Sequence, residues 1–129
     1  MRPMKPPRRK PTDGELAILR VLWTRGSSTV RQIAEVMGRE TGYTTILKLL
    51  QIMTEKRLVV RDESERTHVY QAAYTEDQTQ RQLVTDLLDR AFDGSAAKLV
   101  LQALAANKAS PEELAEIKKL LDTKSGGAR

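Results

Sequence analysis

The feature that most constrains this chain is the stretch 42–56, whose apolar residues recur at the spacing of an amphipathic α-helix. The inward residues are Ile46, Leu49, Leu50 and Met53. The opposite face carries hydroxyl, amide and ammonium groups from Thr44, Thr45, Lys48 and Gln51. Side chains of these kinds can contact base edges and phosphates in the major groove of DNA. A helix with an ordinary solvated polar face would have the same pattern, so this stretch alone leaves both interpretations open.

A short β-hairpin is predicted directly after this helix. Residues 58–61 and 67–70 are two runs rich in β-forming residues, and they flank the charged turn 62–66. The side chains expected to pack on the helices are Leu58, Val60, Val69 and Tyr70. Arg61 and Arg66 stand at the two ends of the turn and can contact phosphate, although three nearby acidic residues weaken the local positive field.

Two shorter helices are predicted before the first stretch, because 12–15 and 29–32 are both capping boxes. Gly26 and Gly38 follow these helices and can end them with a positive φ. The expected inward residues are Leu16, Leu19, Leu22 and Trp23 in the first helix and Ile33, Val36 and Met37 in the second. Three helices and a hairpin are the layout of a winged helix-turn-helix, in which Arg31 would lie beside the DNA backbone. The sequence therefore predicts a mainly α fold with a small β-hairpin, and a DNA-binding domain over 12–74.

Three more helical segments are predicted over 75–123, before a short tail at 124–129. Capping boxes at 75–78 and 110–113 mark the starts of the first and the last of them. Their apolar residues are too many for such short helices to bury against one another, and the segment 96–106 is apolar around most of its circumference. We expect a second copy of the chain to cover them, because a palindromic DNA site requires a two-fold reader. The alternative is a self-contained helical subdomain. The predicted dimerisation residues are Leu83, Leu87, Phe92, Leu99, Val100, Leu101, Leu104, Leu114, Ile117 and Leu121.

The net charge of +5 comes from the first ten residues. They contain five basic residues and no acidic one, which leaves 17 basic and 17 acidic residues in the rest of the chain. Because it also contains several prolines, the segment 1–11 is predicted to be a disordered basic arm. Its residues Arg8, Arg9 and Lys10 can lie along phosphates or reach a minor groove, and the alternative is a solubilising tail.

Several classes of function are excluded by what the sequence lacks. The absence of cysteine excludes disulfides, a thiolate nucleophile and a cysteine metal site. No nucleotide-binding loop, nucleophile elbow or metal-ligand spacing is present, so neither an enzyme nor a cofactor is expected. His68 is the single histidine, and we interpret it as a strand residue, not as a metal ligand or general base. No apolar run reaches the roughly 18 residues of a membrane span, so we expect a cytoplasmic protein.

The order and spacing of six short segments resemble the penicillinase-repressor (BlaI/MecI/CopY) family over about residues 12–122. The segments are 16–23, 29–31 (Thr-Val-Arg), 43–47 (Tyr-Thr-Thr-Ile-Leu), 55–56 (Glu-Lys), 69–70 (Val-Tyr) and 92–95 (Phe-Asp-Gly-Ser). The resemblance implies a dimeric transcriptional repressor with an N-terminal winged helix and a C-terminal dimerisation region. It also implies that Thr44, Thr45 and Lys48 lie on the DNA-reading face of the third helix. Tyr43 and Gln51 are further predicted DNA-contacting residues of this helix.

Three features of the chain depart from that family. Copper-responsive members carry C-terminal cysteines, which are absent here. Members that respond to β-lactams are cut at an Asn-Phe bond, and the matching position is Gln102-Ala103, which argues against induction by a membrane sensor protease at that bond. Many members have glycine after the third helix, where this chain has Arg57. A left-handed arginine would cost about 1–2 kcal/mol, so we expect this helix to end differently.

The sequence as a whole predicts a homodimeric winged-helix repressor that binds a palindromic DNA operator and regulates its own gene or a neighbouring operon. The alternative is a winged-helix module that binds protein within a heteromeric complex. The two differ in the expected salt dependence, because phosphate contacts weaken steeply as salt rises.

Overall fold

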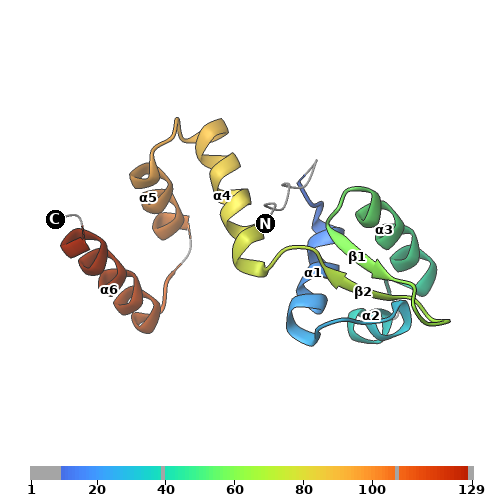
Figure 1. Ribbon diagram of the computed structural model, residues 1–129. Helices are drawn as coiled ribbons and strands as arrows, with labels where there is room; N and C mark the ends of the chain where they lie inside the picture. The colour runs from blue at the N-terminus through green and yellow to red at the C-terminus, as the bar shows by residue number, and fades with distance from the viewer. Residues whose placement is uncertain (1–9, 39, 107, 128–129) are drawn as a thin grey trace. The chain divides into compact units, whose positions relative to one another are not determined.

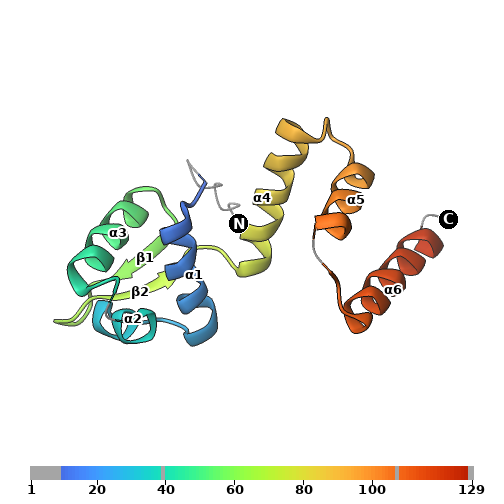
Figure 2. The same cartoon turned by 180° about the vertical axis from the view of Figure 1, so that it is seen from behind.

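The computed structural model describes residues 10–38, 40–106 and 108–127, with side chains up to Lys124. Six helices and two strands follow one another in this part of the chain (Figures 1 and 2). They are α1 (Asp13–Arg25), α2 (Val30–Met37), α3 (Tyr43–Glu55), β1 (Val59–Asp62), β2 (Val69–Ala72), α4 (Glu76–Ala91), α5 (Ala96–Ala106) and α6 (Pro111–Gly127). The chain divides into two compact units between Val84 and Thr85, within α4. The predicted mainly α fold with a small hairpin is confirmed.

The starts of α1 and α2 are the two predicted capping boxes. The Thr12 N–H donates to Glu15 Oε1 at 2.9 Å, and the Glu15 N–H donates to Thr12 Oγ1 at 3.3 Å. Thr29 and Gln32 exchange the same pair of hydrogen bonds at 2.9 and 3.2 Å. Each box satisfies two backbone donors that the first turn of a helix leaves without partners. Local sequence therefore fixes where both helices begin.

The core of the N-terminal unit is formed by α1, α2, α3 and the hairpin, which lie together in Figures 1 and 2. Its buried apolar residues are Ile18, Leu19, Val21, Leu22, Val30, Ile33, Ile46, Leu50, Met53, Leu58, Val59 and Tyr70. Of the residues predicted to point inward, Leu16, Trp23, Met37 and Leu49 are only partly buried. The prediction for Val36 is wrong, since this side chain is 54% exposed. The buried residues of α2 are Val30 and Ile33, both in the first half of the helix, so Ile33 is the only one of the three predicted residues that is fully buried.

The prediction for Val60 is also wrong, and the strand register explains why. β1 and β2 are antiparallel, with Val59 opposite Ala72 and Val60 opposite Gln71. Successive strand residues point to opposite faces, so the burial of Val59 puts Val60 on the outer face, where it is 51% exposed. Leu58 is buried as well, but it precedes the strand. The prediction starts the inward and outward alternation at Leu58, one residue before the strand, and it therefore places every residue of β1 on the wrong face.

The end of α3 differs from the expectation, because Arg57 does adopt a left-handed conformation with φ +66°. The Leu58 N–H donates to the Met53 carbonyl at 2.9 Å, and the Arg57 N–H donates to the Thr54 carbonyl at 3.1 Å. This pair of bonds is the Schellman motif, and the buried side chains of Leu58 and Met53 supply its usual apolar contact. Those contacts hold the arginine in a conformation that glycine would adopt without strain.

A buried ion pair joins the start of α1 to the end of α3. Lys56 Nζ lies 2.8 Å from Glu15 Oε1 and 3.0 Å from Glu15 Oε2. Glu15 is buried although it is charged, and its Oε1 also accepts the N–H of Thr12. A buried carboxylate needs such partners, because desolvation disfavours its charge. One glutamate therefore both caps α1 and fixes the position of α3, the candidate recognition helix.

The helices α4 to α6 are amphipathic, and none of their described side chains between Glu76 and Lys124 is buried. Capping boxes start α4 and α6, as predicted: Thr75 with Gln78, and Ser110 with Glu113. The large apolar side chains that stay exposed are Val84, Leu87, Val100, Leu101, Leu104, Leu114, Leu120 and Leu121, with Leu101 at 65%. Leu83, Phe92, Leu99 and Ile117 are partly covered. In the described residues, no helix is long and apolar enough to cross a membrane.

Candidate nucleic-acid interface

The polar face of α3 is fully presented to solvent. Ile46, Leu50 and Met53 are completely buried, which fixes the rotation of the helix about its own axis. The four residues predicted to read DNA lie on the opposite side, and all of them are exposed: Thr44, Thr45, Lys48 and Gln51. They offer hydroxyl groups near the start of the helix, then an ammonium group and an amide. These are the donors and acceptors that contact base edges in a major groove.

A groove of about 610 Å³ adjoins this helix and connects three elements of the N-terminal unit. It is lined by Thr29, Val30, Arg31, Tyr43, Leu47, Arg66, Thr67, His68 and Tyr70. Three predicted DNA-contacting residues thus lie around one groove: Arg31 from the start of α2, Tyr43 from the start of α3, and Arg66 from the hairpin turn. Tyr43 is exposed. Cationic and hydroxyl groups of this kind suit the sugar-phosphate backbone beside a helix that enters the major groove.

His68 belongs to this groove, which no sequence pattern indicated. It directly precedes β2, so it is not itself a strand residue, and it lines the groove beside Arg66. A β-bridge between Ser28, in the turn before α2, and Tyr70 of β2 brings the hairpin to the groove. The Ser28 N–H donates to the Tyr70 carbonyl at 2.9 Å, and the Tyr70 N–H donates to the Ser28 carbonyl at 2.8 Å. No local sequence signal marks a bridge between residues so far apart in the chain.

The remaining predicted cations lie elsewhere or outside the described residues. Arg61 lines a different hollow, of about 580 Å³, together with Val60, Val69 and Gln71. Lys10 is exposed just before α1, whereas Arg8 and Arg9 lie outside the described residues. The structure therefore brings Arg31, Tyr43 and Arg66 together, and it does not bring Arg61 into their groove.

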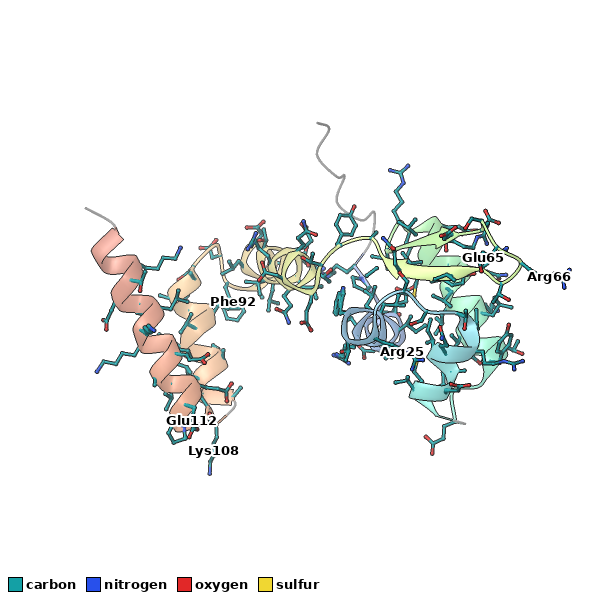
Figure 3. The ribbon with its side chains drawn as sticks, turned by 60° about the horizontal axis from the view of Figure 1, so that its bottom comes forward. Arg25, Glu65, Arg66, Phe92, Lys108 and Glu112 are labelled. Carbon is teal, nitrogen blue, oxygen red and sulfur yellow. The ribbon has the colours of Figure 1, made fainter. Side chains whose placement is uncertain are left out.

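The hairpin turn carries charges of both signs. Arg66 lies at its tip next to Glu65 and extends away from the fold (Figure 3). The Ser64 N–H donates to Asp62 Oδ1 at 2.9 Å, and this hydrogen bond holds the pKa of Asp62 below its ordinary value. Glu63 Oε1 lies 3.4 Å from Arg61 Nη2 and 3.6 Å from His68 Nε2. The positive field of the turn is therefore partly cancelled by its own carboxylates.

Comparison with known proteins identifies the family of this chain. The Penicillinase repressor family matches residues 11–123, nearly the whole chain. The Transcriptional regulator BlaI of Mycobacterium tuberculosis, in strains CDC 1551 / Oshkosh and ATCC 25618 / H37Rv, is 33% identical over 92 residues. That match covers 69% of this chain and 67% of the relative. The resemblance found in the short sequence segments is thereby confirmed: the chain belongs to the penicillinase repressor family of transcriptional regulators.

Proposed function

We propose that this protein represses transcription as a homodimer that binds a palindromic DNA operator. The observation that carries the proposal is the exposed polar face of α3, next to a groove whose lining includes Arg31 and Arg66. In a winged helix, the third helix enters the major groove while neighbouring elements contact the DNA backbone. Family membership supports the regulatory role.

The exposed residues of α3 suggest a division of roles. Lys48 can donate to guanine O6 and N7, and Gln51 can form two hydrogen bonds with adenine. Thr44 and Thr45 can donate to or accept from base edges, and their methyl groups can contact the thymine methyl. The groove residues Arg31, Tyr43 and Arg66, and also Arg61 and Lys10 at other positions, would contact phosphates. Phosphate contacts orient the protein without reading sequence.

The homodimer is supported by the exposed apolar residues of α4 to α6. Large exposed apolar patches on a small protein mark interaction sites. The ten residues predicted to form the dimer interface are all exposed or only partly covered in the single chain. A second copy would cover them and would place two recognition helices on the two halves of a palindrome. Gln102-Ala103 replaces the Asn-Phe bond at which β-lactam-responsive members are cut, so we do not expect the repressor to be released by cleavage at that bond.

The proposal is tested by selecting duplexes from a randomised pool with the full chain. We expect an inverted repeat, and we expect Lys48→Ala to weaken its binding by about 1–3 kcal/mol if Lys48 reads a base edge. Arg20→Ala is the matched control, because Arg20 is an exposed cation on α1 that lies outside the groove. Recovery of unrelated duplexes would contradict sequence-specific binding. Unchanged affinity of both Lys48→Ala and Thr45→Ala would contradict the role of α3.

The alternative is a protein-binding module within a heteromeric complex, and the exposed apolar helices would suit it as well. Measuring DNA affinity over a salt series separates the two functions. An operator-binding protein loses affinity steeply with salt, because each phosphate contact releases counterions. A protein that binds duplex DNA weakly at every salt concentration, but captures a different protein, would favour the alternative.

A further inference from the structure

One carboxylate of the hairpin turn lies between an arginine and a histidine side chain. Glu63 Oε1 is 3.4 Å from Arg61 Nη2 and 3.6 Å from His68 Nε2, and His68 carries a positive charge when it is protonated. Arg61 belongs to β1, and His68 directly precedes β2. The two side chains therefore come from the two arms of the hairpin and share a single carboxylate.

Both contacts are weak enough to be exchanged. The distances exceed those of a charge-assisted hydrogen bond, which is usually about 2.7–2.9 Å long. The side chains of Arg61, Glu63 and His68 are 33%, 56% and 42% exposed, so water screens the attraction. A phosphate oxygen is another anionic acceptor that the same two side chains can contact. It can replace the carboxylate at little cost to the fold.

We propose that Glu63 limits the DNA affinity of the hairpin by occupying, on Arg61 and His68, the position that a DNA phosphate would take. This inference rests on the proposed function, because it assumes that the hairpin lies against DNA. A phosphate must displace the Glu63 carboxylate and remain close to its charge, so every phosphate contact of the hairpin is weakened. Phosphate contacts carry no sequence information, so Glu63 lowers affinity for all duplexes by a similar factor.

Glu63 differs in this respect from the two other acidic residues of the turn. The Asp62 carboxylate accepts the Ser64 N–H and shapes the turn itself. Glu65 stands at the tip beside Arg66 (Figure 3). Among the described residues, its carboxylate forms no ion pair within 4 Å. Replacing Glu65 by glutamine removes the same charge from nearly the same place without freeing Arg61 or His68. It is therefore a matched control for Glu63.

The test compares the full-length wild type, Glu63→Gln and Glu65→Gln on a random-sequence duplex of about 30 base pairs, between about 50 and 200 mM salt. We expect Glu63→Gln to bind about threefold to tenfold more tightly at low salt. The slope of log K against log salt should steepen by about 0.9 for each additional phosphate that the variant neutralises. Glu65→Gln should give a smaller increase in affinity with an unchanged slope.

A second comparison tests whether the tighter binding depends on His68, which Glu63→Gln releases from its carboxylate partner. In a His68→Gln background, Glu63→Gln should tighten binding by a smaller factor than in the wild type. Equal increases in affinity from Glu63→Gln and Glu65→Gln, with equal slopes, would overturn the inference while leaving the proposed function intact. Failure of the wild type to bind the duplex at low salt would instead overturn the proposed function, and the inference with it.

Discussion

The ion pair between Glu15 and Lys56 predicts a large and asymmetric response to mutation. The Lys56→Met variant removes the ammonium group but keeps an unbranched side chain of similar length. The Glu15 carboxylate, whose side chain is 2% exposed, then keeps the hydrogen bond from the Thr12 N–H but loses its ion pair. Breaking a buried pair from one side typically costs about 3–5 kcal/mol. Because Lys56 itself is 16% exposed, we expect a loss of about 2–4 kcal/mol.

The opposite change should cost less. In Glu15→Gln the amide oxygen can still accept the Thr12 N–H, and the Lys56 ammonium can turn toward solvent. We expect a loss of about 1–2 kcal/mol. The double variant should lose no more than that, since it contains no uncompensated buried charge. The effects of the two substitutions on the free energy of unfolding should therefore not be additive. Glu15→Gln should recover part of the stability that Lys56→Met loses.

Denaturant unfolding measured by tryptophan fluorescence provides the assay. Trp23 is the single tryptophan, and its indole N–H donates to the Tyr74 carbonyl at 2.9 Å, so its emission reports on the N-terminal unit. The matched control is Lys48→Met, which removes an exposed lysine from α3, the helix that Lys56 follows. The reasoning is refuted if Lys56→Met costs no more than this control, or if the double variant is less stable than Lys56→Met.

Three further predictions concern α3, the arm and the C-terminal helices. Arg57→Gly should raise the free energy of unfolding by about 0.5–1 kcal/mol. The reason is that the relief of left-handed backbone strain exceeds the stabilising effect of glycine's added entropy on the unfolded chain. Arg57→Ala should give no such increase, because alanine keeps the strain. Deleting residues 1–10 should flatten the salt slope of DNA binding and weaken operator and random duplexes alike, whereas an unchanged slope would indicate a solubilising tail. Leu104→Asp should give a folded monomer with reduced operator affinity in ultracentrifugation and titration, because it puts an unpaired charge in the proposed interface. Val36→Asp is the control outside that interface, and a dimeric Leu104→Asp protein would refute the proposed role of these helices.

The features predicted correctly from sequence are those that neighbouring residues determine. The capping boxes at Thr12 and Thr29 depend on residues three positions apart, so their hydrogen bonds follow from the local chain. The burial of Ile46, Leu50 and Met53 follows from helical spacing alone. Once these three residues are buried, the opposite side of α3, which carries the candidate site, must face solvent. This is why helical spacing is enough to name the candidate base-reading residues.

The features that sequence reasoning missed depend on contacts between distant residues. The capping box of α1 already accounts for Glu15, so no sequence pattern predicts its ion pair with Lys56. His68 reaches the groove through the bridge between Ser28 and Tyr70, which no local pattern encodes. Arg57 accepts strain because the buried Leu58 must follow directly after the helix. In each case, contacts between distant residues select one of several local conformations of similar energy.

The two units of the chain lead to different conclusions about assembly. The N-terminal unit closes a core within one chain, so its fold does not require a partner. The helices α4 to α6 form regular, capped elements, yet their leucines remain outside any core of the single chain. Helical periodicity predicts which residues share a face, but it does not reveal what covers that face. A covering copy would add no contact to DNA, but it would tether a second recognition helix near the first half-site. If the proposed dimer forms, a substitution in α5 would weaken operator binding through that tether, without changing any residue that contacts DNA.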